Sequence, residues 1–288
     1  MDYLSLHIKG EIWFAYPKGI PFPRMFGHFF PSRGSGWVSR FLYFLNRIGG
    51  DRLVLRTTKE LKQLNCLKSL KLDLADVVFF WPSRQRSTGR FYAYKIERKT
   101  KPKVAEYWKI ATTDEEKRLL DCESENTALA AKFANGIFKV AAFLGKIESS
   151  EACIFRYESL PDDAVDLTCS HQNLTIVTKA CEQIREAGYQ HRDFTLHNCK
   201  TSGDDLWVLD WESMRELSPE TPSMMDEISF WLCREHYVAR RNIKELSMDF
   251  QEKYLTGAMG MGENAYESLK ALAQNKFMLA QKVYAMLS

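Results

Sequence analysis

Residues 191–198, HRDFTLHN, constrain the fold of this chain more than any other stretch. In this polar segment the carboxylate of Asp193 and the amide of Asn198 stand five residues apart. With ordinary residue frequencies, a specified His, Arg, Asp and Asn at these offsets should arise by chance in roughly one chain of this size in a thousand. The segment lies between a predicted helix, residues 170–188, and a predicted strand, LWVLDWE, that ends at Asp210. We therefore expect a loop that presents Asp193 and Asn198, followed by a strand that presents Asp210.

The rest of the chain divides into a strand-rich part and a helix-rich part. Residues 76–160 contain the hairpin-like runs DVVFFWPS and RFYAYKIER and the later strands VAEYWKIATT, FKVAAFLGKI and ACIFRYESL. Helix formers between Asp114 and Gly136 predict a helix among them. We predict an N-lobe over 76–160 with a small antiparallel sheet, and a helical C-lobe over 161–288.

Residues 1–75 are predicted to form a basic N-terminal extension. Between Ile12 and Gly50 there are five Lys and Arg but no Asp or Glu, and GWVSRFLYFLNRIGG has the apolar spacing of an amphipathic helix. Two interpretations remain open. The helix packs against its own domain, which is the commoner outcome, or residues 12–50 make a peripheral contact with an anionic membrane surface.

Composition excludes several classes of protein. The 288 residues are 45% hydrophobic and 27% charged, which is typical of a soluble globular chain. The net charge of +3, without aromatics interleaved among basic residues, argues against nucleic-acid binding. Seven scattered cysteines with no C-x-x-C spacing favour neither a disulfide framework nor a zinc site. With no signal-peptide pattern and no run of eighteen apolar residues, we expect a cytoplasmic protein, peripheral at the inner membrane surface if the basic helix binds lipid.

The order of these features resembles the protein-kinase-like superfamily. A strand lobe, a helix, an HRD-x-x-x-x-N loop and a strand-borne Asp follow one another, and Asp-Trp-Glu stands where protein kinases have Asp-Phe-Gly. The resemblance is to the aminoglycoside phosphotransferase and choline kinase branch, with lipopolysaccharide sugar kinases as near relatives, and it covers about residues 76–240. It implies an α+β, two-lobed kinase-like fold that binds ATP and Mg²⁺.

The resemblance also implies roles for individual residues. Asp193 would orient the acceptor hydroxyl and accept its proton, while Asn198 and Asp210 would bind Mg²⁺. Asp226, at the start of an apolar helix, would brace the backbone of the loop. Only sixteen residues separate Asp210 from Asp226, which is short for the segment that grips a peptide and favours a small acceptor.

A lysine on the third strand should neutralise the nucleotide phosphates, held by a carboxylate on the following helix. Lys109, in EYWKIA, is the predicted lysine, and Glu125, sixteen residues on, is its predicted partner. Glu123 is a weaker alternative, because a two-residue shift rotates a side chain by about 200° around a helix. No Gly-x-Gly-x-x-Gly precedes the lysine, so SRQRSTGR, through the backbone N–H groups of Ser87, Thr88 and Gly89, is the predicted phosphate cover.

Together these features predict an ATP- and Mg-dependent phosphotransferase, a kinase that phosphorylates a hydroxyl of a sugar, glycoconjugate or small-molecule alcohol. Two alternatives remain: a protein Ser/Thr kinase, which the short segment after Asp210 disfavours, and a pseudokinase scaffold. A scaffold has no evident need to keep Lys109, Asp193, Asn198 and Asp210 together.

Overall fold

The computed structural model describes residues 2–8, 11–18, 55–59, 61–81, 88–97, 103–161, 163–167, 171–218, 222–256, 262–275 and 277–287. The chain is α+β, and it packs as two compact units. The first comprises Met1–Ser124 and Ala142–Asp162, and the second comprises Glu125–Ala141 and Asp163–Ser288. Among the described residues, no helix has both the length and the apolar character needed to cross a bilayer.

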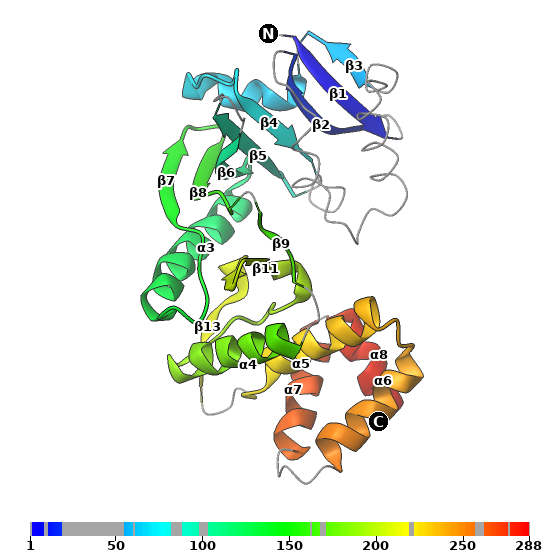
Figure 1. Ribbon diagram of the computed structural model, residues 1–288. Helices are drawn as coiled ribbons and strands as arrows, with labels where there is room; N and C mark the ends of the chain where they lie inside the picture. The colour runs from blue at the N-terminus through cyan, green and yellow to red at the C-terminus, as the bar shows by residue number, and fades with distance from the viewer. Residues whose placement is uncertain are drawn as a thin grey trace. The chain divides into compact units, whose positions relative to one another are not determined.

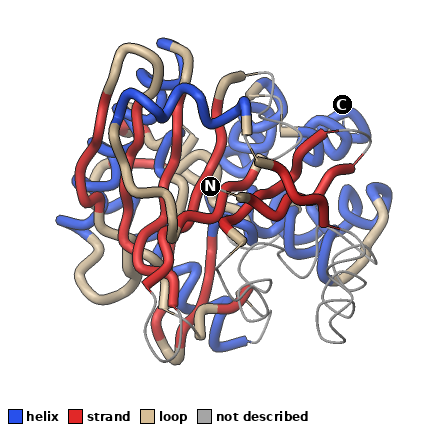
Figure 2. Tube along the Cα trace, turned by 90° about the horizontal axis from the view of Figure 1, so that it is seen from above, coloured by secondary structure: helices blue, strands red, loops and turns tan. Residues whose placement is uncertain are grey.

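The first unit is built on a large antiparallel sheet, with its strands drawn red in Figure 2. Eight strands pair in the order β3-β1-β2-β4-β5-β6-β8-β7 (Figure 1). Their bounds are β1 Tyr3–Ile8, β2 Glu11–Pro17, β3 Leu55–Thr58, β4 Val77–Phe80, β5 Arg90–Glu97, β6 Lys103–Ala111, β7 Phe143–Glu148 and β8 Cys153–Glu158.

Each face of this sheet is covered by a helix, which explains why its central strands read as nearly continuous apolar runs. On one face, the 3-10 helix η2, Lys62–Leu70, packs Leu64 and Leu67 into a cluster with Trp108 and Ile110. On the other face, Leu120 of helix α3, Asp114–Phe133, packs against Ala111, Cys153 and Phe155. Because side chains alternate along a strand, Lys109 lies on the α3 face, between Trp108 and Ile110 in sequence.

The described part of residues 1–75 belongs to this same sheet. β2 pairs with β4 through Phe14↔Phe80 and Ala15↔Phe79, and Ala15 shares a hydrophobic cluster with Val77. The predicted boundary at residue 75 therefore falls inside one packed unit, and these strands are not a separate extension. The predicted basic helix in residues 37–48 lies outside the described residues.

The second unit is mainly helical around two small sheets. Its helices are α4 His171–Glu186, α5 Met225–Cys233, α6 Ile243–Phe250, α7 Gly262–Gln274 and α8 Met278–Leu287, and two π-helical turns, η5 Arg234–Val238 and η6 Gln251–Leu255, follow α5 and α6. Its strands are β9 Val165–Asp166, β10 Tyr189–Gln190, β11 Cys199–Ser202, β12 Asp205–Val208 and β13 Arg215–Glu216, and 3-10 turns occur at η3 Leu196–Asn198 and η4 Trp211–Ser213. The β11–β12 hairpin carries residues 198 and 209 to neighbouring ends of the same ladder. The fully buried rings of Phe194, Trp211 and Phe250 belong to one core that includes α4, α5 and the C-terminal helices.

Candidate functional site

The loop at residues 191–198 closes on itself through its two predicted functional side chains. Asn198 Nδ2 donates to the backbone oxygen of Asp193 and to Asp193 Oδ2, both at 2.9 Å. Since the amide nitrogen makes both contacts, Asn198 Oδ1 points elsewhere and is the atom suited to a cation. The structure thus brings Asp193 and Asn198 together.

The same loop holds the residue that precedes Asp210. The N–H of Leu209 donates to the backbone oxygen of Asn198 at 2.9 Å, and Leu209 O lies 3.0 Å from His191 Nε2. A carbonyl only accepts, so Nε2 carries the proton, and Nδ1 accepts the N–H of Asp193 at 3.4 Å. Burial lowers the pKa of His191 to about 4, which keeps the ring neutral. His191 therefore acts as a structural tie between the loop and the Asp210 segment.

Asp226 braces the loop, as the sequence predicted. Its carboxylate, 3% exposed in the first turn of α5, accepts the backbone N–H groups of His191 at 2.8 Å and Arg192 at 2.7 Å. Arg192 has a φ of 66°, in the left-handed region that costs a non-glycine residue free energy, and the bond from its N–H stabilises this conformation. Burial raises the pKa of Asp226 to about 7, against the opposite effect of the two N–H donors.

Acidic groups surround Asp193. Burial, and then the neighbouring charge of Asp210, raise the pKa of Asp193 to about 6. Asp210 has a φ of 64°, and one of its carboxylate oxygens lies within 4.8 Å of one from Glu212. Hard cations such as Mg²⁺ prefer carboxylate and amide oxygens, so Asn198, Asp210 and Glu212 fit a magnesium site. Glu212 was not predicted as a ligand, although the sequence Asp-Trp-Glu places this second carboxylate two residues after Asp210.

In the first unit, Lys109 is held by Glu123. Lys109 Nζ lies 2.5 Å from Glu123 Oε1, and the two residues are 7% and 2% exposed. Glu125, the predicted partner, is exposed. The prediction that Glu125 holds Lys109 is therefore wrong, and Glu123, the weaker alternative, is the observed partner.

Glu123 is the partner of Lys109 because it lies on the buried face of α3. Glu116, Leu120, Glu123 and Thr127 are all buried, and their spacing of four, three and four residues follows one face of a helix. Glu125 lies about 200° from Glu123 around the axis. Glu116 makes a second buried ion pair on this face, because its Oε2 lies 2.5 Å from Arg90 Nε. Two carboxylates two turns apart thus each meet a cation from the sheet.

The turn before β5 is anchored to the residues that precede α3. The carbonyl oxygen of Gly89 accepts the N–H and the hydroxyl of Thr112, each at 2.9 Å, and Thr113 Oγ1 donates to the oxygen of Thr88 at 3.0 Å. Gly89 has a φ of +86°, and a Cβ there would lie 2.7 Å from Thr113 Cγ2. Ser87 lies outside the described residues, and phosphate binding by this turn stays a prediction.

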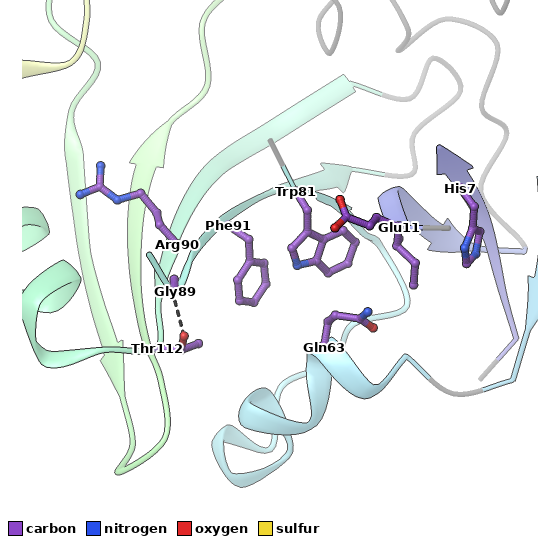
Figure 3. Close-up of a pocket in the computed structure, with 9 residues that line it drawn as sticks. His7, Glu11, Gln63, Trp81, Gly89, Arg90, Phe91 and Thr112 are labelled. Atoms are coloured by element: carbon purple, nitrogen blue, oxygen red, sulfur yellow. Dashed lines mark hydrogen bonds between the residues drawn. The ribbon is translucent and has the colours of Figure 1, made fainter. Parts of the chain in front are cut away.

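A cavity of about 520 Å³ lies in the first unit but away from Lys109 (Figure 3). Its walls include Trp81 and Phe91, whose rings stack with centroids 5.5 Å apart. Both rings belong to the cluster on the η2 face of the sheet, whereas Lys109 lies on the α3 face. Figure 3 shows the guanidinium of Arg90 pointing away from the two rings. Lys109 is therefore not among the residues that line this cavity, whereas Gly89 of the predicted phosphate cover is.

No protein-family model and no curated protein matches this chain. Solved structures of WbdD are similar to this chain, with low TM-scores and low sequence identity. A complex of WbdD with a kinase inhibitor gives a TM-score of 0.41 at 15% identity, covering 67% of this chain and 48% of that chain. A structure described as the bifunctional kinase-methyltransferase WbdD gives 0.42 at 12% identity, covering 74% and 53%. This chain thus spans about half the length of the WbdD chains, and at these TM-scores the likeness assigns neither a fold family nor a function to it.

Proposed function

We propose that this protein is an ATP- and Mg-dependent phosphotransferase with a two-lobed, protein-kinase-like fold, which phosphorylates a hydroxyl of a sugar, glycoconjugate or small-molecule alcohol. One observation carries the proposal: the 191–198 loop is tied to Asp226 and to Leu209, so that Asp193, Asn198 and Asp210 are held as a group. Holding polar side chains in fixed positions is most of what a protein contributes to phosphoryl transfer.

Asp193 accepts the proton in the proposed reaction. The acceptor oxygen bonds to the γ-phosphorus, the bond from that phosphorus to the β–γ bridging oxygen breaks, and ADP leaves, while the hydroxyl proton passes to the Asp193 carboxylate. With a pKa of about 6, this carboxylate is mostly ionised at pH 7 and still basic enough to take a proton. Because Asn198 Nδ2 donates to Oδ2 of Asp193, Oδ1 is the oxygen proposed to face the acceptor.

We propose that the phosphates are neutralised by Mg²⁺ and by the ammonium of Lys109. Asn198 Oδ1, Asp210 and Glu212 would hold Mg²⁺, which neutralises the charge of the phosphate oxygens. Lys109 would neutralise the α- and β-phosphates. Its pair with Glu123 fixes an ammonium that would otherwise move on a flexible stem.

A glycoconjugate acceptor at a membrane surface would also give the basic stretch at residues 12–50 a role. Five Lys and Arg near anionic headgroups contribute up to about 1 kcal/mol each. Sedimentation with anionic or neutral vesicles at low and moderate salt tests this part of the proposal. Protein that stays in the supernatant in every condition leaves a soluble acceptor as the better proposal.

The direct test is a screen of hydroxyl compounds with ATP and Mg²⁺, scored by ADP release above the background without acceptor. Asp193→Asn should lower turnover by at least about a hundredfold while Mg-ATP still raises the Tm. Asp204→Asn, an exposed Asp in the β11–β12 turn, is the matched control and should retain turnover. Equal turnover in Asp193→Asn and wild type, or no ADP release with any compound, contradicts the proposal.

A second variant tests the metal ligands independently of turnover. Asp210→Ala should greatly reduce the Mg-dependent part of the Tm increase caused by ATP, because it removes one of the two proposed carboxylate ligands and leaves only Glu212 beside the neutral oxygen of Asn198. An Mg-dependent increase equal to that of wild type removes Asp210 from the metal site.

A further inference from the structure

An exposed aromatic side chain lies beside the 191–198 loop. Tyr237 is 40% exposed, and its ring centroid lies 5.9 Å from that of His197. His197 is itself exposed, and it stands in the loop between Asp193 and Asn198. The ring of His236 lies T-shaped to that of Tyr237, with their centroids 4.9 Å apart.

The segment that carries Tyr237 is in contact with the loop near Asp193. Phe230 of α5 packs against Phe194 at 6.2 Å, one residue after Asp193. Burial and then the charge of Asp193 raise the pKa of Cys233, the last residue of α5, to about 12, while a bond with the backbone of Leu196 opposes the rise. The end of α5 is thus in contact with the 191–198 loop, and η5 begins at the next residue, Arg234.

The turn that presents Tyr237 is held rigidly. η5 is a π-helical turn, a conformation that is rare and frequent at functional sites. Glu235, 7% exposed, accepts Arg234 Nε at 2.6 Å and lies 3.2 Å from Arg241 Nε. Arg241 is also paired with Asp249 of α6. Ion pairs made by the buried Glu235 and by the partly exposed Arg241 therefore stabilise the turn that carries the exposed ring of Tyr237.

A hexopyranose ring suits this pair of side chains. One face of such a ring is lined by C–H groups that pack on an aromatic face, and hydroxyls around its rim hydrogen-bond to an imidazole, which can donate and accept. An acyclic alcohol has no comparable flat face. We infer that Tyr237 and His197 bind the acceptor beside Asp193, and that this acceptor is a cyclic sugar. The inference rests on the proposed function and narrows its substrate class.

The experiment compares two groups of acceptors with ATP and Mg²⁺. The first contains D-glucose, D-galactose, D-mannose and N-acetyl-D-glucosamine, and the second contains glycerol, ethanolamine and choline. ADP release should require a member of the first group. For that sugar, Tyr237→Ala should raise the acceptor KM about tenfold and Tyr237→Phe should recover most of the loss, because the ring and not the hydroxyl provides the packing. His197→Ala should raise the same KM.

The controls separate binding of the acceptor from folding and from nucleotide binding. Met248→Ala removes a side chain of α6 that is 61% exposed, and it should leave the acceptor KM unchanged. All variants should keep the ATP KM and the Mg-ATP increase in Tm. If a pyranose is phosphorylated but the acceptor KM is unchanged in Tyr237→Ala, Tyr237 does not bind the acceptor, and the proposed function still stands. Turnover with the acyclic alcohols alone overturns the sugar class, and turnover with no compound overturns both proposals.

Discussion

Glu123 and Glu125 form a matched pair of positions on one helix, and replacing each by Gln tests the structure most directly. Glu123 is 2% exposed and pairs with the 7% exposed Lys109, so Glu123→Gln removes the carboxylate that lies 2.5 Å from a buried ammonium. Removing one partner of a buried pair costs about 3–5 kcal/mol. The amide oxygen of Gln still accepts a hydrogen bond, so we expect the low end, about 3 kcal/mol. Glu125 is exposed, and its replacement should change stability by less than about 0.5 kcal/mol.

Thermal unfolding measures the difference. For domains of this size about 1 kcal/mol corresponds to roughly 2–4 °C, so Glu123→Gln should lower the Tm by about 6–12 °C and Glu125→Gln by no more than about 2 °C. The Mg-ATP increase in Tm should shrink in Glu123→Gln, because Lys109 is no longer held. A larger loss in Glu125→Gln than in Glu123→Gln would falsify the pairing that the structure shows.

A double variant separates stability from nucleotide binding. In Lys109→Met/Glu123→Leu no buried charge is left unpaired, and apolar replacements of buried pairs are often neutral or stabilising. Its Tm should recover to near that of wild type, whereas the Mg-ATP increase should be lost. A recovered response to Mg-ATP would show that Lys109 contributes nothing to nucleotide binding.

Two further predictions concern groups with shifted pKa values. Asp226→Asn keeps one acceptor oxygen for two backbone N–H groups, so it should lower stability by about 2 kcal/mol and turnover with it, as measured by urea unfolding and ADP release. Hydrogen bonds from Arg156 and Trp108 lower the pKa of Glu106 to about 2 although burial opposes this. A lowered folded-state pKa stabilises the protein above the unfolded value of 4.5, and this contribution disappears as pH falls from about 4.5 to about 2. Glu106→Gln should therefore destabilise the protein at pH 7 but flatten its loss of stability over that acidic range, and parallel pH profiles for variant and wild type would contradict the assignment.

The sequence predicted the features that depend on local pattern. Runs of β-branched and aromatic residues predicted β4 to β8, helix formers predicted α3, and the resemblance to the kinase-like superfamily implied the brace from Asp226. The pairing of β2 with β4 was not predictable, because it depends on a contact between Phe14 and Phe80, far apart in the chain. Glu123 was placed below Glu125 for a different reason. The choice between two acids on one helix depends on which face is buried, and the buried face of α3 is the one that carries Leu120 and Glu123.

The hydrogen bonds of the 191–198 loop show which of its positions are constrained. Backbone groups make most of the ties: the N–H groups of His191 and Arg192 bond to Asp226, and the backbone of Leu209 bonds at both its N–H and its C=O. Backbone contacts are indifferent to the side chain at the position that makes them, so these bonds do not themselves constrain the residue at position 197. His197→Ala should therefore keep the backbone bonds that hold Asp193 in place. It should raise the KM of the acceptor sugar while leaving the Tm and the Mg-ATP response of the protein as they are.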